Sequence, residues 1–109
     1  MLARLALLAI ALALALAAPA QAATPAQANR QIAACMKARG ALKVQRTADH
    51  EGTAWFGRPF NTAGRWVSWS FTTALDTNQV VRVSASSGRL TRLQRRAVNR
   101  CLRPYHGRL

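Results

Sequence analysis

Acidic residues are scarce in this chain, which has only Asp49, Glu51 and Asp76 against 16 lysines and arginines in 109 residues. Cysteine and histidine are also scarce, with two of each. The cysteines have no CxxC spacing, and the chain contains no P-loop, no GxSxG sequence and no dinucleotide-binding fingerprint. We therefore expect no metal site and no cofactor, and the excess of positive charge is the main functional signal.

The longest apolar run, residues 5–18, contains only Ala, Leu and Ile. It follows a single charge at Arg4 and leads into an Ala-x-Ala cleavage signal that ends at Ala22. Such a run is too short to cross a bilayer comfortably and is typical of a cleaved secretory signal peptide. We therefore predict a signal peptide at residues 1–22 and a single small domain at 23–109. The mature protein is expected to be periplasmic or secreted, with no transmembrane segment after cleavage.

Export has consequences for charge and for the cysteines. Cleavage removes Arg4 and leaves 15 basic residues, 13 of them Arg, against three acidic ones. A charge this far from zero attracts anionic polymers or membranes. Outside the cytoplasm disulfides persist, so we predict a structural bridge between Cys35 and Cys101. The alternative, a reactive or metal-binding thiol pair, is not favoured by the spacing.

Sequence periodicity predicts two helices and several strands. The Thr24-Pro25-Ala26-Gln27 segment has the form of a capped helix start, and Gly40 supplies a stop, which predicts a helix at residues 25–39. Alternating apolar and polar residues predict four strands, at 42–46, 53–57, 65–73 and 80–86. Helical periodicity predicts a second helix at 89–102, and we expect the tail at 104–109 to be irregular. Together they predict an α+β fold. A small antiparallel sheet of three or four strands carries an N-terminal and a C-terminal helix on one face, joined by the disulfide.

The alternation in the two longest predicted strands assigns their inner faces. In the first strand Val67, Trp69 and Phe71 point toward the helices, and Trp66 points away from them. In the second strand the predicted inner residues are Val81, Val83 and Ala85.

The second predicted helix has two distinct sides. At about 100° per residue its apolar side carries Leu90, Leu93, Ala97, Val98, Cys101 and Leu102, and its other side carries six arginines. One interpretation is an ordinary solvated face. The other is a surface for phosphate-rich partners such as lipopolysaccharide, phospholipid headgroups or nucleic acid. Solvated helix faces usually mix both signs of charge, and this one does not. The candidate anion-binding stripe consists of Arg89, Arg92, Arg96 and Arg100.

The segment Asp49-His50-Glu51 is the only acidic cluster. A carboxylate beside a histidine can supply general base chemistry or part of a metal site. Position 54 is Ala, so the HExxH metalloprotease motif is absent. A small, basic, secreted protein with these residues also has the composition of a small ribonuclease. In that reading His50, Glu51 and His106 form the catalytic group, whereas the alternative is an exposed polar turn.

Aromatic residues and arginines are interleaved in the region that follows, at Trp55, Phe56, Arg58, Phe60, Arg65 and Trp66. This composition suits a stacking surface for bases or sugars. The same aromatics can instead close one end of a small core, which is the interpretation that we favour.

Residues 65–104 contain a short set of motifs: a strand ending in Ser86-Ser87-Gly88, then Leu90, an Ala97-Val98 pair seven positions on, and Pro104. In these features the chain resembles the C-terminal domains of the TonB and TolA energy-transducing proteins. The resemblance implies a similar α+β fold and peptide binding by an exposed strand edge.

The sequence therefore predicts a non-enzymatic binding module of the cell envelope that contacts an anionic polymer or an envelope protein. Nucleic acid can bind only non-specifically in this view, because phosphate contacts carry no base information. The alternative is a small secreted ribonuclease-like hydrolase.

Overall fold

The computed structural model describes residues 23–57 and 64–109, and the predicted signal peptide lies outside them. The elements follow in the order α2 (Pro25–Ala38), β1 (Lys43–Ala48), β2 (Glu51–Trp55), β3 (Trp66–Thr73), β4 (Val80–Ser87), α3 (Arg92–Leu102) and the 3-10 turn η2 (Arg103–Tyr105). Within the described ranges, no helix has the length and apolar character needed to span a bilayer.

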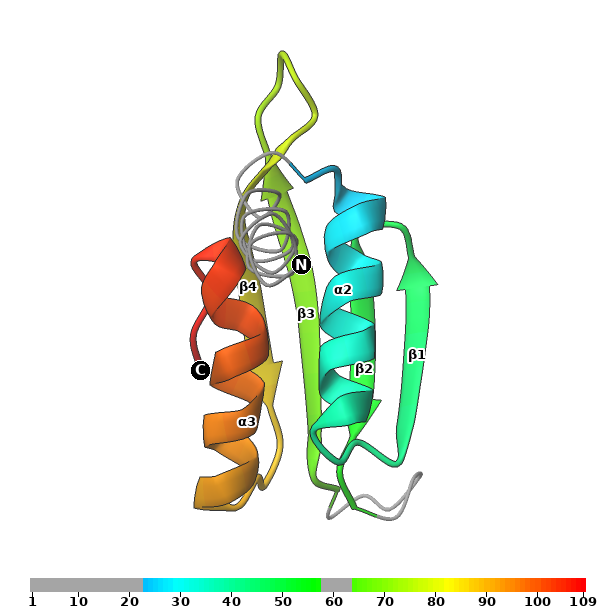
Figure 1. The fold of residues 1–109 in the computed structure, drawn as a ribbon, viewed down its shortest axis with the longest axis vertical. Helices are drawn as coiled ribbons and strands as arrows, with labels where there is room; N and C mark the ends of the chain where they lie inside the picture. The colour runs from blue at the N-terminus through cyan, green and yellow to red at the C-terminus, as the bar shows by residue number, and fades with distance from the viewer. Residues whose placement is uncertain (1–22, 58–63) are drawn as a thin grey trace, which may run out of the picture.

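The four strands form an antiparallel meander in chain order, β1-β2-β3-β4 (Figure 1). Both helices lie on the same face of this sheet, with α2 over β1 and β2 and α3 beside β4 (Figure 1). A disulfide between Cys35 in α2 and Cys101 in α3 joins the helices, with 5.6 Å between the two Cα atoms. The predicted α+β fold and the predicted disulfide are therefore confirmed.

Helix α2 begins as its sequence indicates. The Thr24 hydroxyl accepts a hydrogen bond from the Gln27 backbone N–H at 3.3 Å, and the Gln27 side chain accepts one from the Thr24 N–H at 3.1 Å. Pro25 occupies the first helical position, where its missing N–H has no intrahelical partner to lose. The apolar side of the helix packs on the sheet, and Ala28, Ile32 and Met36 are completely buried.

One polar residue of α2 is also buried. Asn29 is 1% exposed, and its side-chain amide donates to the backbone carbonyls of Ala48 at 2.8 Å and Glu51 at 3.1 Å. Its carbonyl oxygen accepts a hydrogen bond from the Trp69 indole at 2.8 Å. Because every hydrogen-bonding group of the amide is used, Asn29 fixes α2 against the β1–β2 turn and β3 without leaving a buried polar group unpaired.

The predicted inner face of the sheet is largely confirmed. Val67, Trp69 and Val83 are buried, and Phe71 and Ala85 pack against the core while partly exposed. The prediction for Val81 is wrong, because this side chain is 51% exposed. Thr72 pairs with Arg82 and Thr73 with Val80, so Val81 is an extra residue in a β-bulge. A bulge reverses the alternation beyond it, and Val80 packs against the core instead.

The tail at 104–109 is irregular beyond Tyr105, as predicted, but it begins with a 3-10 turn and packs on the sheet. Pro104 and Tyr105 belong to η2, and the Gly107 N–H donates to the Leu102 carbonyl at 3.0 Å. The Leu109 N–H donates to the Asn99 side chain at 2.7 Å. Gly107 lies so close to Val83 that an added Cβ would meet its Cγ1 atom. The tail therefore packs back onto β4, which periodicity alone could not indicate.

Candidate functional site

Helix α3 begins at Arg92, three residues later than periodicity predicts. Its N-cap is Thr91, whose hydroxyl accepts from the Gln94 N–H at 3.1 Å, while the Gln94 side chain accepts from the Thr91 N–H at 3.0 Å. This is a capping box, and the spacing of Thr91 and Gln94 is the sequence signal that places the start. Arg89 consequently precedes the helix and does not belong to its surface.

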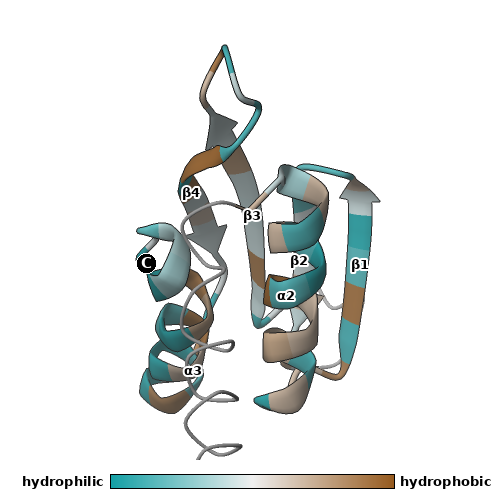
Figure 2. Cartoon of the chain, turned by 45° about the horizontal axis from the view of Figure 1, so that its top comes forward, coloured by the Kyte–Doolittle hydropathy of each residue, from teal (hydrophilic) through white to brown (hydrophobic). Residues whose placement is uncertain are grey.

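The helix presents its arginines on the side that does not pack on the core. Val98, Cys101 and Leu102 are the buried residues of α3. Arg92, Arg96 and Arg100 are exposed and follow each other at intervals of four residues, so they lie along one stripe. Arg103, at the start of η2, is exposed as well. In Figure 2 the α3 ribbon is accordingly mostly hydrophilic in colour.

A groove of about 560 Å³ lies between this surface and the C-terminal end of α2. We call it the arginine groove; it is lined by Arg39, Leu93, Arg96, Ala97, Asn99, Arg100 and Arg103. Three of its four cations come from α3 and η2, and the fourth is the C-cap residue of α2. The disulfide therefore holds together the two elements that supply the charges.

The four guanidinium groups of the groove form no ion pair with a residue of the described ranges, 23–57 and 64–109. Asp49 and Glu51 lie at the β1–β2 turn, and Asp76 lies in the β3–β4 turn. In a meander both turns are at the same end of the sheet, whereas Arg39 follows α2 at the other end, about 20 Å away along a helix of this length. The cations of the groove are thus distant from the acidic side chains, whereas Arg30 and Arg46 lie near Asp49 at the other end.

Much of this arrangement opposes the formation of α3. The first turn of the helix contains no acidic residue, although it carries Arg92 and Arg95 at the positive end of the helix dipole. Arg92 and Arg96, and likewise Arg96 and Arg100, are like charges four residues apart, which destabilises a helix by about 0.2–0.5 kcal/mol per pair. The repulsion along Arg92, Arg96 and Arg100 therefore opposes helix formation, whereas Arg100 alone is also favourably placed in the last turn, at the negative end of the helix dipole.

Leu93 departs from its predicted place on the apolar side of the helix. Its side chain is 76% exposed and lines the arginine groove. The buried side of α3 is centred on Val98 and Cys101, and at 100° per residue Leu93 falls outside that arc. An apolar side chain therefore lies in water between the cations of the groove.

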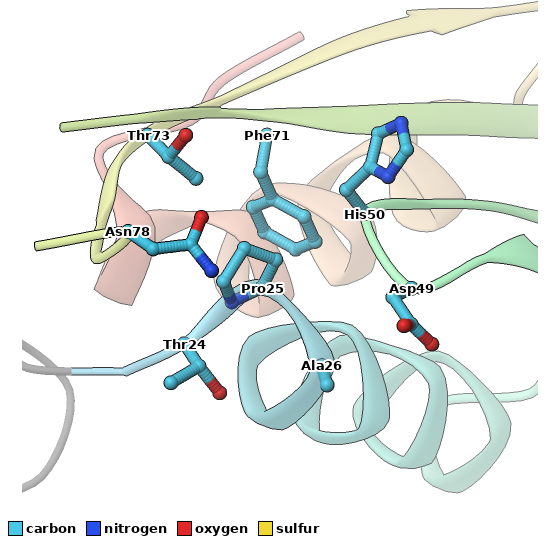
Figure 3. Close-up of a pocket in the computed structure, with 8 residues that line it drawn as sticks. All are labelled: Thr24, Pro25, Ala26, Asp49, His50, Phe71, Thr73 and Asn78. Atoms are coloured by element: carbon cyan, nitrogen blue, oxygen red, sulfur yellow. The ribbon is translucent and has the colours of Figure 1, made fainter. Parts of the chain in front are cut away.

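The second candidate location is a cavity of about 470 Å³ at the opposite end of the sheet (Figure 3). Its lining comes from the start of α2, the β1–β2 turn, β3 and the β3–β4 turn: Thr24, Pro25, Ala26, Asp49, His50, Phe71, Thr73 and Asn78. Figure 3 shows the Phe71 ring and Pro25 between His50 on one side and Asn78 on the other. The cavity brings Asp49 and His50 together, but neither Glu51 nor His106 lines it.

The proposed catalytic group of His50, Glu51 and His106 is spread over several places. Gly52 lies against the Trp69 indole and so faces the helices, which makes its strand neighbour Glu51 face the other side of the sheet. His106 is exposed in the tail, at the C-terminal end of η2, with a φ of 58°. In the described part of the chain, no group of three or more His, Cys, Asp or Glu residues is arranged to hold a metal ion.

The aromatics between β2 and β3 have two different roles. Phe56 is 8% exposed and belongs to the core, as the favoured interpretation predicts. Trp55 and Trp66 are paired across β2 and β3 and are half-buried on the sheet face away from the helices. The Lys43 ammonium lies over the Trp55 ring, 5.7 Å from its centroid. Arg58 and Phe60 lie outside the described residues.

Comparisons with protein-family models, with curated proteins and with solved structures find no match for this chain. The resemblance of residues 65–104 to the TonB and TolA domains rests on the sequence motifs alone.

Proposed function

We propose that the mature chain is a non-enzymatic binding module of the cell envelope, periplasmic or secreted, that binds an anionic partner in its arginine groove. The observation that carries the proposal is the convergence of four exposed arginines, from the end of α2, from α3 and from η2, on one groove, with no ion pair among the described residues. Guanidinium groups match phosphate and carboxylate oxygens in geometry and charge. A partner rich in either group, an anionic envelope polymer or an acidic envelope protein, complements this surface.

Two further features support the proposed location. The first is the predicted signal peptide at residues 1–22. The second is the disulfide between Cys35 and Cys101, since such bonds form and persist in oxidising compartments. Both features favour the periplasm or the extracellular medium.

The experiment compares two variants of equal charge. In the groove variant Arg39, Arg96, Arg100 and Arg103 are replaced by Gln; in the control variant Arg30, Arg46, Arg65 and Arg82, which do not line the groove, are replaced by Gln. Affinity for inorganic polyphosphate is measured by titration at low salt. Surface cations near a polyanion contribute on the order of 1 kcal/mol each, so the loss of four should weaken binding by the groove variant by up to about a thousandfold relative to wild type.

The control variant should lose much less affinity than the groove variant, because its substitutions remove no cation from the groove and change only the overall electrostatic field of the molecule. Equal losses in the two variants would mean that binding follows net charge alone and that the groove is not a site.

A further inference from the structure

We infer that the partner of the arginine groove is an amphiphile, a phosphate-bearing lipid presented at a membrane surface. This inference rests on the proposed function and adds the substrate class. It starts from Leu93, which is 76% exposed and lines the same groove as the four arginines.

The groove has an apolar part and a charged part. Leu93 and Ala97 are one turn apart on α3 and lie on its groove side, and Arg96 and Arg100 flank them. A purely ionic ligand gains nothing from Leu93, whereas a lipid can place its phosphate against the guanidinium groups and its glycerol and first methylenes against the leucine. Burying apolar surface adds to the electrostatic attraction that clusters of basic residues have for anionic lipid surfaces.

The groove lacks what a nucleic acid would use. Single strands are held by aromatic side chains on which bases stack, and among the described residues no aromatic side chain lines the arginine groove. The tryptophans of the described residues lie in β2 and β3, within the sheet and not around the groove. The chemistry of the groove therefore favours phosphate joined to aliphatic carbon over phosphate joined to bases.

The test uses the exported form of the chain, purified from the periplasm or the medium, so that binding does not depend on the apolar leader. Two probes are titrated: vesicles of phosphatidylglycerol and phosphatidylcholine, which present phosphate and aliphatic carbon, and inorganic polyphosphate, which presents phosphate alone. The variants are Leu93→Ser, Leu93→Met and Leu75→Ser. Leu75 is fully exposed in the β3–β4 turn and is the matched control. That turn lies at the opposite end of the molecule from the start of α3, the helix that carries Leu93 (Figure 1).

Loss of the partial burial of one leucine should weaken vesicle binding by Leu93→Ser about tenfold. Polyphosphate binding by the same variant should not change. Leu93→Met should bind vesicles like wild type, since it keeps an apolar side chain of similar volume, and Leu75→Ser should bind both probes like wild type. Both positions are exposed, so these substitutions leave the core unchanged.

The other results overturn the inference in distinguishable ways. Wild-type binding to polyphosphate but not to vesicles, or equal vesicle binding by wild type and Leu93→Ser, rejects the lipid while the proposed function stands. Equal losses in Leu93→Ser and Leu75→Ser show general apolar adhesion and reject the groove as the lipid site. Absence of binding to both probes rejects the inference and the proposed function together.

Discussion

The indole N–H of Trp69 in β3 donates a hydrogen bond to the side-chain oxygen of Asn29 in α2, with 2.8 Å between the two heavy atoms. Trp69 is 2% exposed and Asn29 is 1% exposed, so this bond lies entirely inside the core. It connects the helix to the strand while the amide group of the same asparagine holds the β1–β2 turn. Together with the apolar contacts of α2 and the disulfide, this bond helps to fix α2 on the sheet, and Arg39 follows that helix.

The first prediction concerns this bond. Replacing Trp69 by Phe keeps most of the apolar volume but leaves the Asn29 oxygen buried without a donor, which should lower the free energy of unfolding by about 1–3 kcal/mol. Trp69→Ala also opens a cavity and should lower it by about 3–5 kcal/mol. Urea denaturation measures both. A Trp69→Phe variant as stable as wild type would contradict the role assigned to the bond.

The second prediction concerns Gly52 in β2. A Cβ atom at this position would lie 2.5 Å from the Trp69 ring atom Cζ2, which no side-chain rotation of residue 52 can relieve. We expect Gly52→Ala to displace the indole and to destabilise the fold by about 1–3 kcal/mol, the usual range for overpacking. Gly57→Ala is the control, because its Cβ would be 3.4 Å from its nearest neighbour, Arg65. Equal melting temperatures for the two variants would count against this packing.

The third prediction concerns the disulfide. Cys35 and Cys101 are separated by 66 positions, and closing a loop of that length in the unfolded chain stabilises the native state by roughly 4 kcal/mol on the chain-entropy estimate. Replacing both cysteines by Ala should therefore lower the free energy of unfolding by an amount of that order. Mass spectrometry of the exported protein should show two hydrogens fewer than in the reduced form. Two free thiols in that form would be incompatible with the structure.

The fourth prediction concerns alkaline pH. Burial raises the pKa of the Tyr105 phenol above its usual value of 10.0, because the charged form loses its hydration. In both the folded and the unfolded chain the phenol is neutral below about pH 10, so the stability that depends on a neutral Tyr105 is fully present there. Above that pH the unfolded chain ionises first, and the contribution is lost as the pH rises toward the pKa of the folded state.

Tyr105→Phe should remove this part of the loss of folding stability at alkaline pH, since the phenyl ring cannot ionise. It should also keep or raise the stability at neutral pH, because the buried Tyr105 hydroxyl has no hydrogen-bond partner in the described part of the chain. Thermal unfolding between about pH 8 and pH 11 compares wild type and variant in the range where the phenol titrates. Identical pH profiles would show that Tyr105 does not titrate between the two states.

The sequence predicts the elements of this fold well where the local signal is strong. The Thr24 capping box, the apolar stripe of α2 and the alternation around Trp69 all act over a few residues, and the structure confirms them. Val81 could not be placed, because a bulge depends on how two strands pair and not on either strand alone. The buried Asn29 was missed for a related reason: its partners at Ala48, Glu51 and Trp69 are distant in the sequence.

The candidate site was only partly accessible to sequence reasoning. Arg96 and Arg100 follow from helical spacing, but Arg39 reaches the groove through the packing of α2 beside α3. Arg103 lines the groove because the chain continues past α3 into η2. Arg89 was included because the start of α3 was set too early, although the Thr91 and Gln94 pair carried the correct signal. Leu93 is predicted on the apolar side because that side is drawn too wide: at about 100° per residue it falls outside the arc centred on Val98 and Cys101.

The fifth prediction is the salt dependence of anion binding, which tests the central claim most directly. Affinity for a mixed-sequence single-stranded oligonucleotide is measured at several salt concentrations for wild type, the groove variant and the control variant. Each lost phosphate contact lowers the slope of log K against log salt by about 0.7, so the groove variant should lose about 3 units of slope. The control variant should lose far less, and a change of oligonucleotide sequence should have little effect. A groove variant with the wild-type slope, or a control variant with an equal loss, would contradict the account.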